Sequence, residues 1–180
     1  MPFLRATLFS LCALWLSACS TSPPAGIHPV TPFELNRYLG QWYEIARLDH
    51  SFERGMSDVS ATYELQGDGS VKVINRGYDT RRQAWKEAVG RAVFVGDPAV
   101  GSLKVSFFGP FYGGYHILAL DPENYRWSLV AGPDRDYLWI LAREQTLPPE
   151  ILDSLLARAR ALGFPVDQLI RVEHRKTGTN

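Results

Sequence analysis

The sequence predicts an all-β protein: an eight-stranded up-and-down antiparallel barrel with one C-terminal α-helix packed on the outside and a short ninth strand. Residues 40–143 form short segments of alternating apolar and polar residues, separated by Gly, Pro and Asp, which is typical of sequential β-hairpins. From residue 149 the apolar residues instead recur at intervals of three and four, which indicates one amphipathic helix. The chain is 46% hydrophobic and 12% aromatic, so residues 33–180 can form one packed domain.

Residues 1–18 are expected to be a lipoprotein signal peptide. Arg5 supplies a positive charge, and residues 6–18 are mostly apolar but too few to span a bilayer as a stable helix. They run into the motif LSAC at positions 16–19, which resembles the bacterial lipobox. That resemblance implies that Cys19 is diacylated on its sulfur, becomes the mature N-terminus and is N-acylated. A plain signal peptide cut near this point is the alternative.

The expected location is the outer membrane of a Gram-negative bacterium, with the protein lipid-anchored and facing the periplasm. One acyl chain anchors a protein only marginally, at about 0.8 kcal/mol per buried methylene, whereas two or three chains hold it stably. The residue after Cys19 is Ser20, not the Asp that retains many lipoproteins at the inner membrane. Residues 19–32 contain four prolines and few apolar residues, which predicts a flexible tether.

Eight barrel strands follow in order, separated by turn residues such as Asp97-Pro98 and Gly113-Gly114. Closing eight strands removes both sheet edges and leaves an interior large enough for one small ligand. The strands are predicted at residues 40–48, 58–65, 71–78, 85–95, 102–108, 114–121, 126–131 and 137–143.

The helix is predicted to begin at Pro149 and to end before Gly163. Its apolar stripe must cover another surface, and the outer wall of the barrel is available. A helix lying on a membrane surface is the alternative, but this one carries only two basic residues. Residues 169–173 are predicted to be the ninth strand, along the outside of the barrel. The stripe consists of Ile151, Leu152, Leu155, Leu156, Ala159 and Leu162.

Cysteine content and net charge narrow the class of protein. The chain has two cysteines, and Cys12 leaves with the signal peptide, so the mature chain has no intramolecular disulfide. Without a disulfide, stability must come from a packed core.

The formal net charge is zero and neither sign forms a long run, so the sequence indicates no nucleic-acid partner.

Two segments about a hundred residues apart carry a family resemblance. GQWYEIAR at 40–47 and YLWILAR at 137–143 together resemble the lipocalin signature. The resemblance implies that Gly40 opens the first barrel strand, that Trp42 lies across the closed base, and that Arg143 lies over the Trp42 ring. A guanidinium stacked on an indole contributes roughly 0.5 to 2 kcal/mol, which would join the two ends of the sheet.

Further blocks extend the resemblance over nearly the whole mature chain, from Phe33 to His174. FELNRYLG at 33–40, KVINRGY at 72–78, KVSFFGPFYGGY at 104–115 and LVAGPDRDY at 129–137 are similar to bacterial lipocalins of the outer-membrane lipoprotein type. Lipocalins of this type have been seen as dimers, so the resemblance also allows a homodimer.

The lipocalin signature turns Trp42 inward, so strict alternation places Glu44 and Ala46 on the same inner face. Small inner residues, Ala46, Ala61 and Ala119, argue against a completely filled barrel, which is the alternative. The resemblance sets the phase of the other strands and predicts these further inner residues: Val59, Ala61, Tyr63, Val71, Val73, Asn75, Leu103, Val105, Phe107, Tyr115, Ile117, Ala119, Trp139 and Leu141.

The candidate ligand-binding residues are Tyr63, Asn75, Phe107, Tyr115 and Trp139. They form part of a largely apolar wall with a few polar groups toward one end. Such a wall suits an acyl chain whose polar head lies at the mouth.

No catalytic, metal-binding or cofactor site is predicted, and the protein is not expected to be an enzyme. The histidines, His28, His50, His116 and His174, are scattered without metal-ligand spacing. The chain also lacks a Gly-x-Ser-x-Gly motif and a phosphate-binding glycine loop.

The sequence therefore predicts an outer-membrane-anchored lipocalin that binds and stores or transports a lipophilic ligand in the periplasm. The expected partners are a fatty acid or lysophospholipid and, through the N-terminal anchor, the membrane. One alternative is an envelope structural or interaction protein with a filled barrel. Another is a tetrapyrrole carrier, although no histidine or methionine is predicted at a clearly inward position, since His116 alternates outward.

Overall fold

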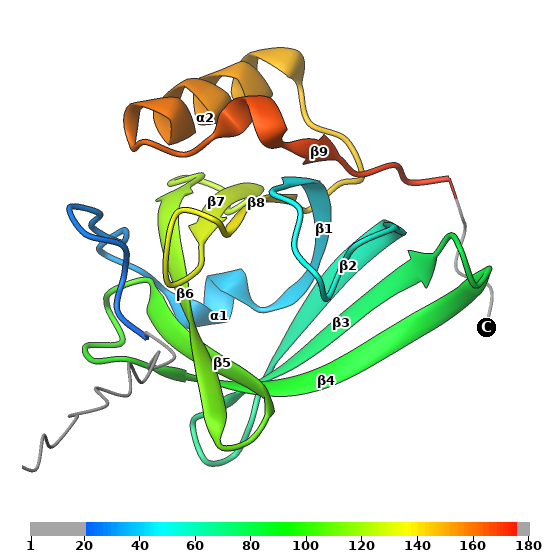
Figure 1. Cartoon of the computed structure of the whole chain (residues 1–180). Helices are drawn as coiled ribbons and strands as arrows, with labels where there is room; N and C mark the ends of the chain where they lie inside the picture. The colour runs from blue at the N-terminus through cyan, green and yellow to red at the C-terminus, as the bar shows by residue number, and fades with distance from the viewer. Residues whose placement is uncertain (1–20, 176–180) are drawn as a thin grey trace, which may run out of the picture.

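The computed structural model describes residues 21–175, which form a closed antiparallel barrel with one helix on its outer side (Figure 1). The predicted signal peptide and Cys19 lie outside the described residues. The predicted fold class is confirmed, and the strands lie close to the predicted ranges, except that Gly113-Gly114, predicted as a turn, lies within the sixth strand. They are β1 (Gly40–Arg47), β2 (Met56–Leu65), β3 (Val71–Asp79), β4 (Ala84–Phe94), β5 (Ser102–Phe108), β6 (Phe111–Leu120), β7 (Trp127–Ala131) and β8 (Leu138–Ala142).

Strand β1 closes the barrel because it pairs along both edges. Tyr43 lies opposite Ser60 of β2 on one edge and opposite Ala142 of β8 on the other. The β1–β2 ladder ends at this point, and the short ninth strand β9 (Ile170–Arg171) then pairs with the end of β1. Strand β9 thus pairs with the edge of β1 along the part where β2 no longer pairs with it. The C-terminal segment therefore lies between the diverging ends of β1 and β2.

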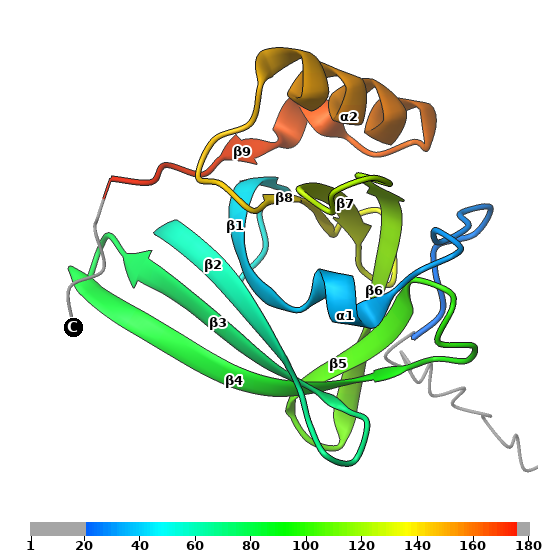
Figure 2. The ribbon, with the colours of Figure 1, turned by 180° about the vertical axis from the view of Figure 1, so that it is seen from behind.

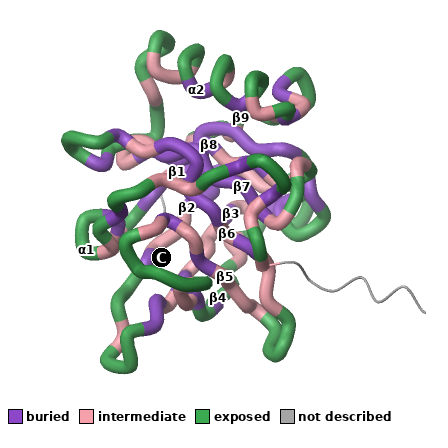
Figure 3. The backbone as a smooth tube through the Cα atoms, turned by 90° about the vertical axis from the view of Figure 1, so that its left-hand side faces the viewer, coloured by how far each residue is buried: buried purple, intermediate pink, exposed green. Residues whose placement is uncertain are grey.

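Helix α2 (Pro149–Ala161) packs over β1, β7 and β8, on the outside of the barrel (Figure 1). It ends in a Schellman motif: the N–H of Phe164 donates to the carbonyl of Ala159 at 3.1 Å, and Gly163 adopts a φ of +84°. Buried positions are concentrated where these strands face the helix (Figure 3). None of the helices in residues 21–175 is long and apolar enough to cross a membrane.

The barrel wall separates two apolar cores, and two β-bulges decide which residues belong to each. Strict alternation predicted Ala46 and Ala119 inside the barrel, and this prediction is wrong. The register with the neighbouring strand shifts between Glu44 and Ala46 and again between Ile117 and Ala119. One extra residue reverses the alternation beyond it, so both alanines lie in the outer core under α2.

The N-terminal segment is packed on the barrel over much of the range predicted to be a tether. Ile27 is buried in the outer core, and the N–H of Val30 donates to the carbonyl of Ile117 at 2.8 Å. The short helix α1 (Leu35–Tyr38), which was not predicted, follows and crosses the closed end of the barrel (Figure 2). It brings Tyr38 into the inner core.

Candidate ligand-binding cavity

Trp42 and Arg143 hold the closed end of the barrel. The guanidinium carbon of Arg143 lies 4.0 Å from the centre of the Trp42 ring, and Trp42 is fully buried. Arg143 also donates to the carbonyl oxygens of Gln41 and Arg37, each at 2.9 Å. Gly40 has a φ of +91°, and a Cβ there would lie 3.4 Å from the Arg143 guanidinium. A residue with a side chain at position 40 would therefore have a strained backbone and would crowd the Arg143 guanidinium.

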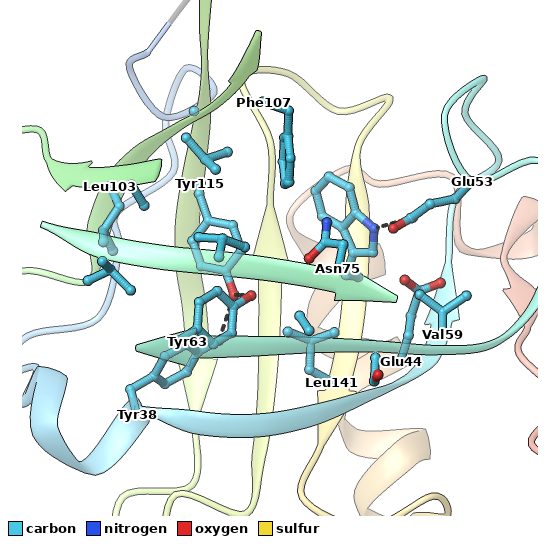
Figure 4. A pocket seen from close by; sticks show the side chains of 18 of the residues that line it. Tyr38, Glu44, Glu53, Val59, Tyr63, Asn75, Leu103, Phe107, Tyr115 and Leu141 are labelled. Carbon is cyan, nitrogen blue, oxygen red and sulfur yellow. Dashed lines mark hydrogen bonds between the residues drawn. The ribbon is translucent and has the colours of Figure 1, made fainter. Parts of the chain in front are cut away.

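A cavity occupies the interior of the barrel (Figure 4). The cavity has a volume of about 100 Å³. A single water needs only about 10–15 Å³, so side chains do not fill this barrel. Its apolar wall includes Phe33, Leu35, Phe52, Val59, Ala61, Val71, Val73, Ala92, Leu103, Val105 and Leu141.

All five candidate ligand-binding residues line this cavity: Tyr63, Asn75, Phe107, Tyr115 and Trp139. They do not gather at the mouth, where the sequence interpretation placed the polar head of a ligand. Tyr63 lies opposite Gly40 in the β1–β2 ladder, which places it near the closed end. The polar groups that alternation identified are therefore mostly at the base of the cavity.

Three tyrosines form a hydrogen-bonded chain at this base. The Tyr115 hydroxyl lies 2.8 Å from the Tyr63 hydroxyl and 2.8 Å from the Tyr38 hydroxyl, and Tyr38 continues to Ser128 Oγ at 3.2 Å. Burial raises the pKa of Tyr38 to about 12 and raises the pKa values of Tyr63 and Tyr115 well above their usual range. All three are therefore neutral hydroxyls at physiological pH.

A second polar group lies farther along the cavity, where β1 leads into the β1–β2 loop. Glu44 Oε1 lies 2.7 Å from Arg47 Nη1, and Glu53 Oε2 accepts a hydrogen bond from Trp139 Nε1 at 3.1 Å (Figure 4). Both glutamates are buried and line the cavity. Burial and the neighbouring Glu53 carboxyl raise the pKa of Glu44 well above its usual range, although Arg47 opposes this. This end of the cavity is acidic.

Sequence reasoning missed eight of the residues that line the cavity: Phe33, Leu35, Tyr38, Phe52, Glu53, Ser60, Ala92 and Gly114. Tyr38 comes from the helix that precedes the barrel, and Phe52 and Glu53 come from the β1–β2 loop. These three lie outside the strands, so alternation could not identify them. The only available signal was the resemblance of FELNRYLG, which contains Tyr38, to a lipocalin block.

The histidines do not extend this site. His116 points away from the cavity, as alternation predicted, but it is completely buried and its Nδ1 lies 3.0 Å from Ser102 Oγ. Within residues 21–175, no three His, Cys, Asp or Glu side chains are arranged to hold a metal ion. No histidine, cysteine or methionine is among the described residues that line the cavity.

Comparison with known proteins agrees with the barrel fold. The family model described as a lipocalin-like domain matches residues 33–174. The chain is a lipocalin. It is 54% identical to the outer membrane lipoprotein Blc of Citrobacter freundii over 162 residues, which cover 89% of this chain and 91% of the relative. It is 48% identical to the protein of the same name from Vibrio cholerae over 172 residues, which cover 96% and 100%.

More distant lipocalins share the fold. Apolipoprotein D from Macaca fascicularis is 37% identical over 143 residues, which cover 75% of this chain and 71% of the relative. The solved structure of insecticyanin from the tobacco hornworm Manduca sexta superposes with a TM-score of 0.68 at 19% identity, covering 84% of this lipocalin and 87% of that chain. At that identity the likeness concerns the fold alone.

These comparisons support an outer-membrane lipocalin that binds lipophilic ligands and is lipid-anchored in a Gram-negative bacterium. Lipocalins are generally binding and transport proteins, not enzymes.

Proposed function

We propose that this lipocalin, anchored through Cys19, binds single-chain acyl lipids in the periplasm and stores or transports them there. The proposed ligands are a fatty acid or a lysophospholipid. The observation that carries the proposal is the unfilled cavity, whose wall is mostly apolar and aromatic. An acyl chain is the kind of molecule that such a wall can hold by burial of apolar surface.

The shape of the molecule supports the same function. The closed base, with Trp42 under Arg143, leaves the opposite end of the barrel for ligand entry. Phe52 lines the cavity and is 54% exposed, so apolar surface continues from the interior to the outside at the β1–β2 loop. An acyl chain can therefore remain in contact with apolar side chains as it enters.

The direct test is native mass spectrometry of the delipidated mature chain, carrying Cys19→Ser, after exposure to palmitate at pH 5.5 or to a palmitoyl lysophospholipid. We expect one ligand per chain. Titration should also produce a saturable change in tryptophan fluorescence, with Trp139 as the main reporter because it lines the cavity.

Phe107→Asp should weaken binding at least tenfold, because it places a carboxylate where the acyl chain must be desolvated. Phe108→Asp is the matched control, since the neighbouring Phe108 is 82% exposed and does not line the cavity. If the folded wild-type protein binds none of these acyl ligands, the function proposed here is wrong.

A further inference from the structure

Exposed phenylalanines gather at the open end of the barrel. Within residues 21–175, the most exposed large hydrophobic side chains are those of Phe108, Phe111 and Phe52, at 82%, 68% and 54%. Phe108 and Phe111 flank the β5–β6 turn, and Phe52 lies in the β1–β2 loop. In an up-and-down barrel, all connections from an odd-numbered to an even-numbered strand lie at the same end. Both loops are therefore at the end opposite the closed base, where β1 begins.

Residues 108–111, here called the β5–β6 tip, form a compact apolar surface. Phe108 lies opposite Phe111 in the β5–β6 ladder, and the Cβ atoms of such a pair are about 4.5–5.5 Å apart. Residues 105–115 include no charged side chain. The neighbouring Phe107 lines the cavity, so apolar side chains continue from the tip into the barrel. An exposed apolar surface of this kind indicates contact with an apolar partner.

The start of the described chain lies on the same side of the barrel as this tip. The Ser22 backbone lies beside the ring of His116 in β6, the strand that carries one half of the tip. Arg135 Nη2, in the β7–β8 loop of the open end, donates to the Ala25 carbonyl at 3.0 Å. Cys19 precedes Ser22 by three residues, which span at most about 11 Å. A chain anchored through Cys19 is therefore held with this side of the barrel close to the bilayer.

We propose that the β5–β6 tip docks on the bilayer that holds the lipid anchor, with Phe108 and Phe111 inserted at the depth of the lipid head groups. Burial of two exposed aromatic rings favours insertion, and the tip carries no charge that would have to be desolvated. Lys104 Nζ lies 5.2 Å from the centre of the Tyr112 ring, behind the tip, where an ammonium can face lipid phosphates. The open end then faces the membrane, so a lipid enters the cavity without crossing bulk water. This inference rests on the anchoring through Cys19 in the proposed function and adds a second membrane contact.

A fluorescent label at the tip tests whether it reaches the lipid in the anchored protein. Cys12 leaves with the signal peptide and Cys19 is acylated, so Pro110→Cys supplies a free thiol for an environment-sensitive dye. The lipidated protein is placed in vesicles of three parts phosphatidylethanolamine to one part phosphatidylglycerol, with nitroxide groups on the acyl chains. We expect blue-shifted emission and quenching by the nitroxide. Leu65→Cys is the matched control, because Leu65 is also exposed but lies at the β2–β3 turn of the closed end.

Removal of the apolar tip tests whether docking depends on it. In the mature chain carrying Cys19→Ser, the pair Phe108→Asp and Phe111→Asp should reduce sedimentation with the same vesicles, made without nitroxide, at least tenfold, because insertion would then desolvate two carboxylates. Leu65→Asp should sediment as the chain carrying only Cys19→Ser does. Palmitate binding in solution should persist in the double variant, because neither phenylalanine lines the cavity. Circular dichroism shows whether each barrel is intact.

Each contrary outcome has its own meaning. Equal quenching of the labels at positions 110 and 65, or equal sedimentation of the double variant and the chain carrying only Cys19→Ser, would overturn docking through the tip. If the two aspartates instead convert a dimer to a monomer in analytical ultracentrifugation without lipid, and the label at position 110 is not quenched, a second copy of the chain covers the tip and the inference is wrong. Failure to bind palmitate would refute the proposed lipid binding, whereas vesicle sedimentation and label quenching do not depend on it. The two failures are therefore distinguishable.

Discussion

The contact between Arg143 and Trp42 gives a quantitative test of what closes the base of the barrel. Trp42 is fully buried, its ring packs 4.6 Å from the ring of Tyr38, and its Nε1 donates to the Tyr38 carbonyl at 2.8 Å. Trp42→Ala empties this site, and truncation of a buried aromatic residue costs about 3 to 5 kcal/mol of stability.

Arg143→Ala should cost less. It removes the guanidinium 4.0 Å from the Trp42 ring and hydrogen bonds to the carbonyls of Gln41, Arg37 and Tyr125 at 2.9, 2.9 and 3.3 Å. Arg143 is partly exposed, so water replaces some of these bonds, and we expect a loss of about 2 to 3 kcal/mol.

The double mutant should lose less than the sum of the single losses, because both changes remove the same cation–π contact. The coupling expected for such a contact is about 0.5 to 2 kcal/mol. Urea unfolding followed by circular dichroism measures all four proteins without relying on the fluorescence of Trp42. Arg91→Ala is the control partner, since Arg91 is exposed and its guanidinium pairs with Asp68 in the β2–β3 turn, not with the Trp42 ring. Losses for Trp42 and Arg143 that add within about 0.5 kcal/mol would refute the reasoning.

Three further predictions concern the anchor, a buried histidine and the N-terminal segment. Cys19→Ala should leave an uncleaved or soluble protein on cell fractionation; the same mature form in the outer-membrane fraction would disprove lipidation at Cys19. Burial lowers the pKa of His116 to about 4, so only the unfolded chain takes up this proton between about pH 6.5 and pH 4. The free energy of unfolding should therefore decrease by up to about 3 kcal/mol as the pH is lowered through that window. In urea melts, the free energy of unfolding of His116→Gln should depend less on pH than that of the wild type. A Cβ at Gly101 would lie 2.9 Å from Val30 Cγ2, so Gly101→Ala should speed hydrogen exchange of the Val30 amide, whereas Gly96→Ala, which meets open space, should not.

The strands and their closure could be predicted from the sequence because their signals are local. Alternation has a period of two whatever the rest of the chain does, and pairs such as Asp97-Pro98 mark turns by their own backbone preferences. The helix could be predicted because, from Pro149, the apolar residues recur at intervals of three and four instead of two. The chain order of the strands then left few topologies besides sequential hairpins.

The residues that alternation misplaced lie beyond bulges. An inserted residue at Ile45 or Leu118 has no local signature, because it is set by packing between β1, β8, β6 and β7. The same reason explains the N-terminal segment. Its composition indicated a tether, but Ile27 finds an apolar site under the C-terminal helix that exists only after the barrel has folded.

The bulge in β1 also determines the charge pattern of the cavity. On a regular strand Glu44 and Arg47, three residues apart, would face opposite sides of the sheet. The extra residue at Ile45 puts them on the same side, where they pair at 2.7 Å, and turns Ala46 outward under α2. Without the bulge, the Glu44 carboxylate would be buried without its cation, which is strongly unfavourable. One inserted residue thus provides a small, flat contact for the helix and pairs Arg47 with a wall carboxylate, so that this arginine is not available as a counter-ion for an anionic ligand.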